Sequence, residues 1–187
     1  MFEFINGYKK DYVEALEKID NQQLENLFNL IEATKENGNN IFMLGNGGSA
    51  ASASHWVCDF NKGVNVDGVK RLKMFSLTDN TPLFSALGND FSYEDSFLEQ
   101  VKNYLEPGDL VVGLSVSGNS ENIVRAIEYA NDHSANTFSI IGDFGGKMGE
   151  ISNETIVVPS KNYGIVEDIH MYTCHVLSQY MYQNNAK

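Results

Sequence analysis

The first forty residues carry apolar positions at helical spacing. The stretches YVEALEKI and LENLFNLIEAT place apolar side chains three and four residues apart, and the turn-forming run NGNN follows at 37–40. Apolar positions with a period of about 3.6 residues mark one face of a helix, and Asn-Gly pairs favour a turn. The pattern therefore predicts two helices over residues 2–37, or one helix with a break near Asn21.

The pattern changes after position 40. Short apolar runs now alternate with helix-like segments and turns, and they cover 41–45, 71–79, 109–117, 137–143 and 154–160. Near-continuous apolar strands that alternate with helices are typical of a parallel sheet covered on both faces. We therefore predict a three-layer, doubly wound α/β fold with five parallel strands after the N-terminal helices. The final stretch IVEDIHMYTCHVLSQYMYQ predicts one long helix, and 63–70 predict a surface loop.

The composition fits one compact domain over residues 1–187. A chain of 187 residues with 42% hydrophobic content can bury one core, while two domains would be small. No apolar run approaches the roughly 18 residues of a membrane span, and the N-terminus lacks the basic start of a signal peptide. We expect a soluble cytoplasmic protein whose two cysteines, Cys58 and Cys174, are reduced and buried.

The net charge narrows the range of partners. A formal net charge of −12 repels phosphate backbones and anionic membranes, so we expect neither nucleic acid nor a membrane as a partner. An anionic ligand would be held by local dipoles, such as the backbone N–H groups of a loop at a helix N-terminus.

Two loops rich in glycine and serine offer such dipoles. GNGGSA follows the apolar run 41–45, and SVSGNS ends the run that begins at 109. In open parallel sheets, ligands bind beyond the carboxyl ends of the strands, where loops lead into helices. One such loop is equally well explained as an ordinary strand-to-helix turn, but two on one sheet favour a pocket for a phosphate or a polyol. The candidate side chains are Ser49, Ser115, Ser117, Asn119 and Ser120.

Histidines and carboxylates form a candidate metal set. His55 and Asp59 lie four residues apart, so on one helix both can reach one ion, and a solvent-side hydrogen bond between them is the alternative. The final helix carries Glu167, Asp168 and His175. Glu167 and His175 are eight residues apart, an offset of roughly 80°, whereas Asp168 and His175 are seven apart and align better. The spacing leaves open whether Asp168 is a ligand or orients one.

Taken together, the motifs resemble the phosphoheptose isomerases of the sugar-isomerase (SIS) domain family. In chain order they are GNGGSA, a histidine with an acid four residues later, LGND at 87–90, EPGDLVVGLSVSGNS, GKMG at 146–149 and the helix VEDIH…H. The resemblance implies a flavodoxin-like SIS fold over residues 1–187, with 1–40 as a helical extension used in oligomer packing and 41–187 as the α/β core. It also implies a homotetramer with sites at subunit interfaces.

The same resemblance implies an activity and a set of site residues. The family interconverts sedoheptulose 7-phosphate and D-glycero-D-manno-heptose 7-phosphate for lipopolysaccharide or capsule heptose biosynthesis, often with zinc or a similar divalent metal, one ion per site. The matching metal positions are His55, Asp59, Glu167 and His175. The matching substrate positions are Asn46, Gly47, Gly48, Asn89, Asp90, Ser115, Ser117 and Ser120, to which Ser49 adds a hydroxyl.

An aldose–ketose isomerisation of this kind passes through a cis-enediol. A base removes the proton beside the carbonyl, and an acid moves a proton between the two oxygens. Asp59 or Glu167 is the candidate base and His175 the candidate acid, with the metal polarising the carbonyl.

A few positions depart from the family pattern and keep two alternatives open. The departures are Asp59 for a usual glutamate, Glu167 for a usual glutamine, Val116 for a threonine, and Gly164 with Ile165 for a polar pair. They allow an isomerase or sensor for a different phosphosugar. The other alternative is a metal-free SIS adaptor that binds a protein partner, against which the four ligand-capable side chains favour an enzyme.

Overall fold

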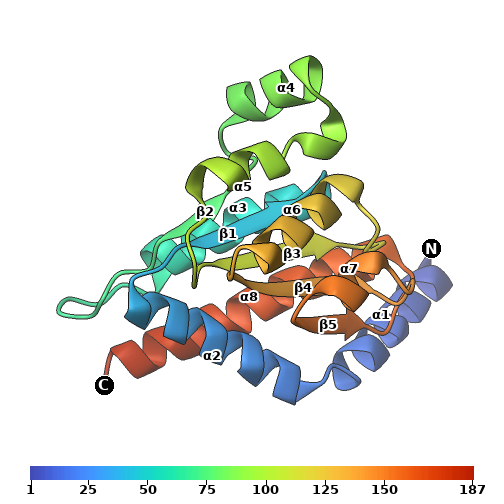
Figure 1. Ribbon diagram of the computed structural model, residues 1–187. Coiled ribbons are helices and arrows are strands. Elements are labelled where there is room, and N and C mark those ends of the chain that lie inside the picture. The colour runs from blue at the N-terminus through green and yellow to red at the C-terminus, as the bar shows by residue number, and fades with distance from the viewer.

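Five parallel strands form the central sheet of the computed structural model, which describes residues 1–187 (Figure 1). In sheet order they are β2 (Met74–Ser76), β1 (Ile41–Gly45), β3 (Leu110–Ser115), β4 (Asn136–Gly142) and β5 (Glu154–Val158). Because β2 lies on one side of β1 and β3 on the other, the chain changes its direction across the sheet between β1 and β3. Loops that leave two such strands border a crevice, which is where open α/β sheets bind ligands.

Helices cover both faces of the sheet, as the sequence pattern predicts. One face is covered by α1 (Phe2–Glu17), α2 (Asn21–Asn37), α3 (Gly48–Cys58) and α8 (Tyr163–Asn185). The other face is covered by α5 (Leu98–Tyr104), α6 (Glu121–Asp132) and α7 (Lys147–Ile151). The predicted three-layer, doubly wound α/β fold with N-terminal helices and a long final helix is therefore confirmed.

Alternate residues of the central strands β1, β3 and β4 face two different hydrophobic cores. In β1, Ile41 and Met43 face the core shared with α2, α3 and α8, whereas Phe42 and Leu44 face the core shared with α5, α6 and α7. All of β1 is buried. Burial on both faces explains why the strands form continuous apolar runs in the sequence instead of alternating ones.

The edge strand β2 is shorter than the predicted run 71–79. Only Met74–Ser76 pair with β1. On the open edge, the Asn61 carboxamide takes the place of a further strand: its Nδ2 donates to the Met74 carbonyl (2.7 Å) and its Oδ1 accepts from the Met74 N–H (3.1 Å). A side chain that satisfies an edge in this way also hinders pairing with another chain.

The break near Asn21 separates two helices. The Asp20 side chain caps α2 by accepting a hydrogen bond from the Gln22 N–H (2.8 Å), and Gly38 ends α2 with a left-handed backbone (φ 79°). Aspartate and glycine are favoured at these two positions because one accepts from a free N–H and the other tolerates positive φ.

The helix that carries His55 changes type just before Asp59. After α3 ends at Cys58, one π-helical turn, η1 (Asp59–Gly63), continues it. The Val64 N–H donates to the Asp59 carbonyl (3.2 Å), which closes this wider turn. Single π-helical turns within helices are frequent at functional sites, and here the turn begins at a predicted metal ligand.

One helix projects from the body of the fold. None of the residues of α4 (Thr81–Asp90) is buried, and a short 3-10 turn, η2 (Tyr93–Asp95), leads from it to α5 (Figure 1). The N-terminal helix α1 is also largely exposed, with Phe2 and Phe4 84% and 72% exposed. None of the helices has the combination of length and apolar content that crossing a bilayer requires.

Candidate active site

A small cavity opens at the carboxyl ends of β1 and β3, between the loops that follow these strands. Its volume is about 180 Å³, and we call it the serine cavity. The residues that line it are Asn46, Ser49, Leu114, Ser115, Val116, Ser117, Ser120, Tyr163 and Glu167. Five of the predicted substrate residues therefore lie together at the edge of the sheet where the topology places a ligand.

Hydrogen bonds within the loop after β3 orient its serines. The Ser115 hydroxyl accepts from the Gly118 N–H and lies near the Ser120 hydroxyl, both at 3.1 Å. The Ser117 hydroxyl accepts from the Asn119 N–H (3.2 Å). The loop leads directly into α6. Since the first N–H groups of a helix have no partner within it, hydroxyls and N–H groups together make a cradle suited to an anion.

The loop after β1 brings its backbone against Glu167. Gly47, with a φ of +54°, precedes Gly48, the first residue of α3. The carboxylate of Glu167, from α8, packs on Gly48 so closely that a β-carbon at this position would overlap both of its oxygens. The missing side chain of Gly48 therefore makes room for a carboxylate at the N-terminus of α3, where the helix dipole favours negative charge.

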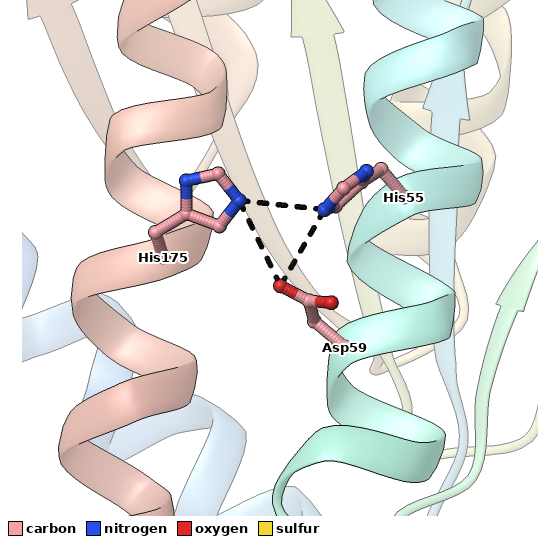
Figure 2. Close-up of side chains that lie close together, drawn as sticks. All are labelled: His55, Asp59 and His175. Atoms are coloured by element: carbon pink, nitrogen blue, oxygen red, sulfur yellow. Dashed lines mark hydrogen bonds and ion pairs between the residues drawn. The ribbon is translucent and has the colours of Figure 1, made fainter.

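A second group of side chains lies where α3 and α8 pack together, and we call it the His–Asp–His cluster. His55 of α3, Asp59 at the start of η1 and His175 of α8 point toward one another (Figure 2). The Asp59 Oδ2 atom lies 3.6 Å from His55 Nε2 and 3.8 Å from His175 Nε2. The two Nε2 atoms are 3.3 Å apart.

The donor set of this cluster suits a divalent metal ion. The three ligand atoms lie within 4.8 Å of one another. Two imidazole nitrogens and a carboxylate oxygen are typical ligands of catalytic zinc, which keeps a further position for water or substrate. The side chains of His55 and His175 are 48% and 46% exposed, which leaves the cluster open to solvent. These three residues therefore fit the metal that the resemblance implies.

Glu167 lies outside the cluster, although the resemblance implies it as a fourth ligand. Glu167 and His175 are separated by eight residues of α8, about 12 Å of helix rise at roughly 1.5 Å per residue. The Glu167 carboxylate lies at Gly48 and lines the serine cavity instead. The eight-residue offset allowed the Glu167 side chain to point toward the cluster or toward the serine cavity. It points toward the cavity, where the missing side chain of Gly48 leaves room for it.

Asp168, the alternative ligand, is outside the cluster as well. Its Oδ2 accepts a hydrogen bond from the Tyr8 hydroxyl of α1 (3.1 Å). Asp168 therefore ties the N-terminal helix to α8, and the seven-residue spacing from His175 is not used for a shared site.

Cys174 contacts Asp59 from the buried side of the cluster. Its thiol, which is fully buried, donates to Asp59 Oδ2 at 3.9 Å. Burial and the nearby Asp59 charge raise the pKa of this thiol, so it stays protonated and remains a donor. The sequence predicted that Cys174 is buried but not that it contacts Asp59. Cys174 and its neighbour His175 point in different directions from α8, so the two were not expected to share a site. Cys58 is exposed, which corrects the expectation of two buried cysteines.

His170 connects the helices beneath the two groups. Its buried imidazole donates from Nε2 to the Ile140 carbonyl of β4 (3.1 Å), and its own carbonyl accepts from Trp56 Nε1 of α3 (3.1 Å). Burial lowers the pKa of His170 to about 4, so the ring is neutral near pH 7. It is a core histidine and takes no part in the cluster.

Two predicted substrate residues lie on a different helix from both groups. Asn89 and Asp90 end the projecting helix α4, are exposed, and pair with each other through Asn89 Nδ2 and Asp90 Oδ1 (2.8 Å). Within one chain, the structure therefore does not bring them to the serine cavity.

Sequence reasoning missed the aromatic residue that lines the cavity. Tyr163 lies four residues before Glu167, so both share one face of α8. Its ring packs edge-on against Phe144, with centroids 6.0 Å apart. The four-residue spacing from a candidate acid was the signal that could have revealed it.

Comparison with known proteins assigns the family. The SIS domain model matches residues 5–142. A phosphoheptose isomerase from Aquifex aeolicus is 35% identical over 158 residues, which are 84% of this chain and 82% of the relative. This chain belongs to the phosphoheptose isomerases of the SIS domain family. The resemblance drawn from the motifs is thus confirmed, and with it the assignment to the aldose–ketose isomerases.

Solved structures of phosphoheptose isomerases share the whole fold. The enzyme from Neisseria gonorrhoeae has a TM-score of 0.87 and 26% identity, over 96% of this chain and 97% of that one. The enzyme from Francisella tularensis has a TM-score of 0.86 and 25% identity, over 97% and 98% of the two chains. The five-stranded sheet and the long final helix are therefore those of phosphoheptose isomerases.

Proposed function

We propose that this phosphoheptose isomerase homologue interconverts sedoheptulose 7-phosphate and D-glycero-D-manno-heptose 7-phosphate through a cis-enediol. The observation that supports it most is a carboxylate, Glu167, in the same small cavity as an anion cradle of serines. The cradle would hold the phosphate, which is remote from the reacting carbons, and so orient the sugar. The named relatives supply the substrate class.

The proton transfers need a base and an acid. Glu167 stands where the family usually has glutamine, and it is the base that we favour in this chain. Asp59 is one methylene shorter than the usual glutamate, whereas Glu167 lines the serine cavity and forms no hydrogen bond or ion pair with the chain. Asp59 is the alternative, but its Oδ2 faces two imidazoles and a thiol. His175 is the proposed acid that moves a proton between the substrate oxygens; because the proposed ion would occupy its Nε2, the proton would be carried on Nδ1.

The proposal includes one zinc or similar divalent ion per site. His55, Asp59 and His175 would hold it, without the fourth ligand that Glu167 was expected to supply. A bound ion would act as a Lewis acid on the substrate carbonyl. The metal content of the purified protein tests this part, and it also separates the enzyme from a metal-free adaptor.

The proposal also includes a homotetramer with sites at subunit interfaces. Two exposed features support it: the apolar side chains Phe2 and Phe4 on α1, within the N-terminal extension 1–40, and the unburied helix α4 with Asn89 and Asp90 at its end. In an assembly, α4 of one chain could bring these two residues to another chain's cavity. Light scattering on the wild-type protein and on a Phe2→Ser, Phe4→Ser variant tests the assembly.

The substrate is tested directly by offering several phosphosugars. Sedoheptulose 7-phosphate and shorter ketose phosphates are incubated with the protein, and NMR identifies any aldose phosphate formed. We expect turnover of sedoheptulose 7-phosphate in particular. Turnover of a shorter ketose phosphate alone would favour the isomerase for a different phosphosugar. The expected setting of the reaction is the cytoplasm, in heptose biosynthesis for lipopolysaccharide or capsule.

A further inference from the structure

Asn46, one of the residues of the serine cavity, is held by a network of hydrogen bonds. Its carboxamide pairs with that of Asn122: Asn46 Nδ2 donates to Asn122 Oδ1 (2.9 Å), and Asn122 Nδ2 donates to Asn46 Oδ1 (3.0 Å). The Tyr93 hydroxyl donates to the same Asn46 Oδ1 at 2.8 Å. Asn122 is 2% exposed, so this pairing is shielded from water.

The direction of these hydrogen bonds follows from a serine. Ser96 donates its single hydroxyl proton to the Tyr93 carbonyl (2.7 Å), so its oxygen accepts from Asn122 Nδ2 (3.3 Å). The Asn122 atom that contacts the Ser96 oxygen must therefore be a donor, which makes it the nitrogen of the carboxamide. In the reciprocal pair, the Asn46 atom that faces this nitrogen is the oxygen, and the other is the nitrogen. Both lone-pair positions of Asn46 Oδ1 are occupied, and one of its N–H bonds is used. One N–H of Asn46 is left free.

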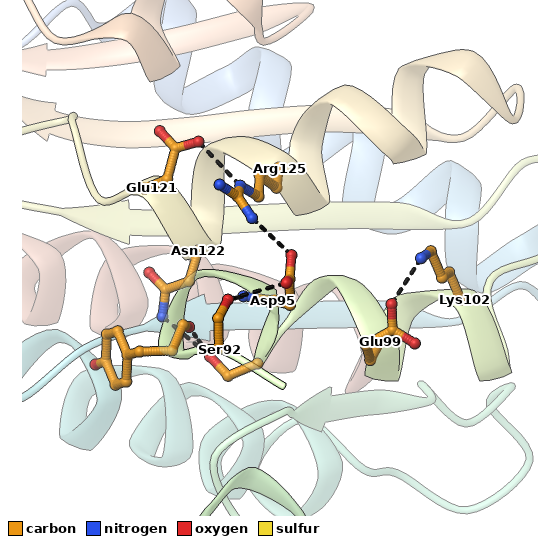
Figure 3. A network of polar contacts seen from close by, with 9 residues as sticks. Ser92, Asp95, Glu99, Lys102, Glu121, Asn122 and Arg125 are labelled. Carbon is orange, nitrogen blue, oxygen red and sulfur yellow. Dashed lines mark hydrogen bonds and ion pairs between the residues drawn. The ribbon is translucent and has the colours of Figure 1, made fainter. Parts of the chain in front are cut away.

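The segment that carries Tyr93 is fixed to the helix that carries Asn122. Figure 3 shows Arg125 of α6 between two carboxylates. Its Nη1 donates to Asp95 Oδ1 at 2.7 Å and its Nε donates to Glu121 Oε1 at 3.0 Å. Since Asp95 lies two residues after Tyr93, this ion pair holds the tyrosine at its distance from Asn46.

We propose that Tyr93 and Asn122 are positioning residues that make Asn46 a hydrogen-bond donor toward an oxygen of the bound sugar phosphate. This rests on the proposed function, because it takes the serine cavity as the substrate site. A free N–H recognises an acceptor, such as a phosphate, hydroxyl or carbonyl oxygen. At that position an ammonium group, as in an amino sugar, would find no acceptor in Asn46.

Tyr93→Phe tests this role with a minimal change. It removes the hydroxyl and keeps the ring that packs edge-on against Phe84. We expect the Kd for sedoheptulose 7-phosphate, measured by calorimetry, to rise about fivefold to tenfold, as the weakening of one hydrogen bond predicts. The melting temperature should fall by no more than a few degrees, as expected for the loss of one hydrogen bond from a half-exposed tyrosine. Tyr104→Phe, at an exposed tyrosine whose hydroxyl bonds to nothing in the chain, is the matched control and should leave the Kd unchanged.

A double-mutant cycle separates positioning from a general structural effect. In an Asn46→Ala background, Tyr93→Phe should not raise the Kd further, because the tyrosine acts only through Asn46. Asn122→Asp, which offers Asn46 only acceptors, should weaken binding more than Tyr93→Phe does. Fully additive effects of Tyr93→Phe and Asn46→Ala would overturn the inference.

Binding and turnover are measured separately, so the two proposals can fail separately. If the wild-type protein binds sedoheptulose 7-phosphate without turning it over and the cycle is non-additive, the proposed isomerisation fails and the positioning role stands. If the wild-type protein turns it over and the cycle is additive, the isomerisation stands and the positioning role fails. A wild-type protein that binds no sugar phosphate would overturn both.

Discussion

The serine cavity and the His–Asp–His cluster are organised in opposite ways. In the cavity, side chains such as Ser115 and Ser117 already bond to the backbone of their own loop. In the cluster, the imidazoles of His55 and His175 contact only each other and Asp59 as polar partners, and nearly half of each is exposed. The cavity is thus preorganised by the backbone for an anion, whereas the cluster presents three ligand atoms suited to a cation.

The largest expected effect is on turnover, and it comes from filling the space that the missing side chain of Gly48 leaves for the Glu167 carboxylate. In Gly48→Ala, the new β-carbon would overlap the Glu167 carboxylate and force it to move. If Glu167 is the base, its displacement should slow turnover by about 100- to 10,000-fold, the usual contribution of a positioned base. Turnover assays check this, with metal content as the measure of an intact cluster. Gly7→Ala, where a β-carbon would contact nothing, is the control.

The next largest effect is on the free energy of unfolding, which should depend on pH because of the buried His170. His170 has a pKa of about 4 in the folded chain, below the ordinary value of 6.5, so the unfolded chain binds its proton more readily. Stability should therefore be complete above pH 6.5 and fall by about 3 kcal/mol as the pH decreases to 4. Urea unfolding between these pH values measures this slope. His170→Gln should flatten it, and an unchanged slope would show that another group causes the loss.

Stabilisation of the folded chain by a metal ion is a slightly smaller effect, and it distinguishes the cluster from the cavity. An ion that binds only the folded chain should stabilise it by about 2.7 kcal/mol at a concentration of one hundred times its Kd. Zinc should therefore raise the free energy of unfolding of the wild-type protein, but not that of His175→Ala. Ser117→Ala, a change in the cavity, should respond as the wild type does. Equal stabilisation of His175→Ala would place the ion elsewhere.

The smallest effect belongs to a single hydroxyl of the cradle. Ser117→Ala removes one hydrogen-bonding group from the cavity and should weaken binding of the sugar phosphate by about 2- to 12-fold, the range for one hydrogen bond. A calorimetric Kd measures this change. An unaltered Kd would remove Ser117 from the phosphate cradle and leave that role to Ser115 and Ser120.

The sequence predicted the parts of this architecture that depend on local pattern. Apolar runs located all five strands, and the spacing of His55 and Asp59 placed both on one side of a helix. The sheet topology then places the loops after β1 and β3 side by side, and the glycines and serines of these loops had already indicated a ligand pocket. These predictions succeeded because helix periodicity and strand burial are visible in a single stretch of chain.

What the sequence did not predict depends on contacts between distant residues. The eight-residue spacing allowed Glu167 to face either the cluster or the cavity, and only Gly48, on another helix, accounts for the choice. The partner of Asp168, Tyr8, lies 160 residues away. The short length of β2 likewise follows from its place at the sheet edge, where Asn61 replaces a neighbouring strand.

The central claim is that Glu167, in the serine cavity, is the base, and a comparison of two nearly isosteric variants tests it most directly. Turnover of sedoheptulose 7-phosphate is followed by NMR for Glu167→Gln and Asp59→Asn, with the metal content of each protein measured in parallel. We predict that Glu167→Gln loses about 100-fold or more in turnover while its metal content matches that of the wild type. Wild-type turnover in Glu167→Gln, together with lost turnover in a fully metal-loaded Asp59→Asn, would contradict the account and assign the base to the cluster.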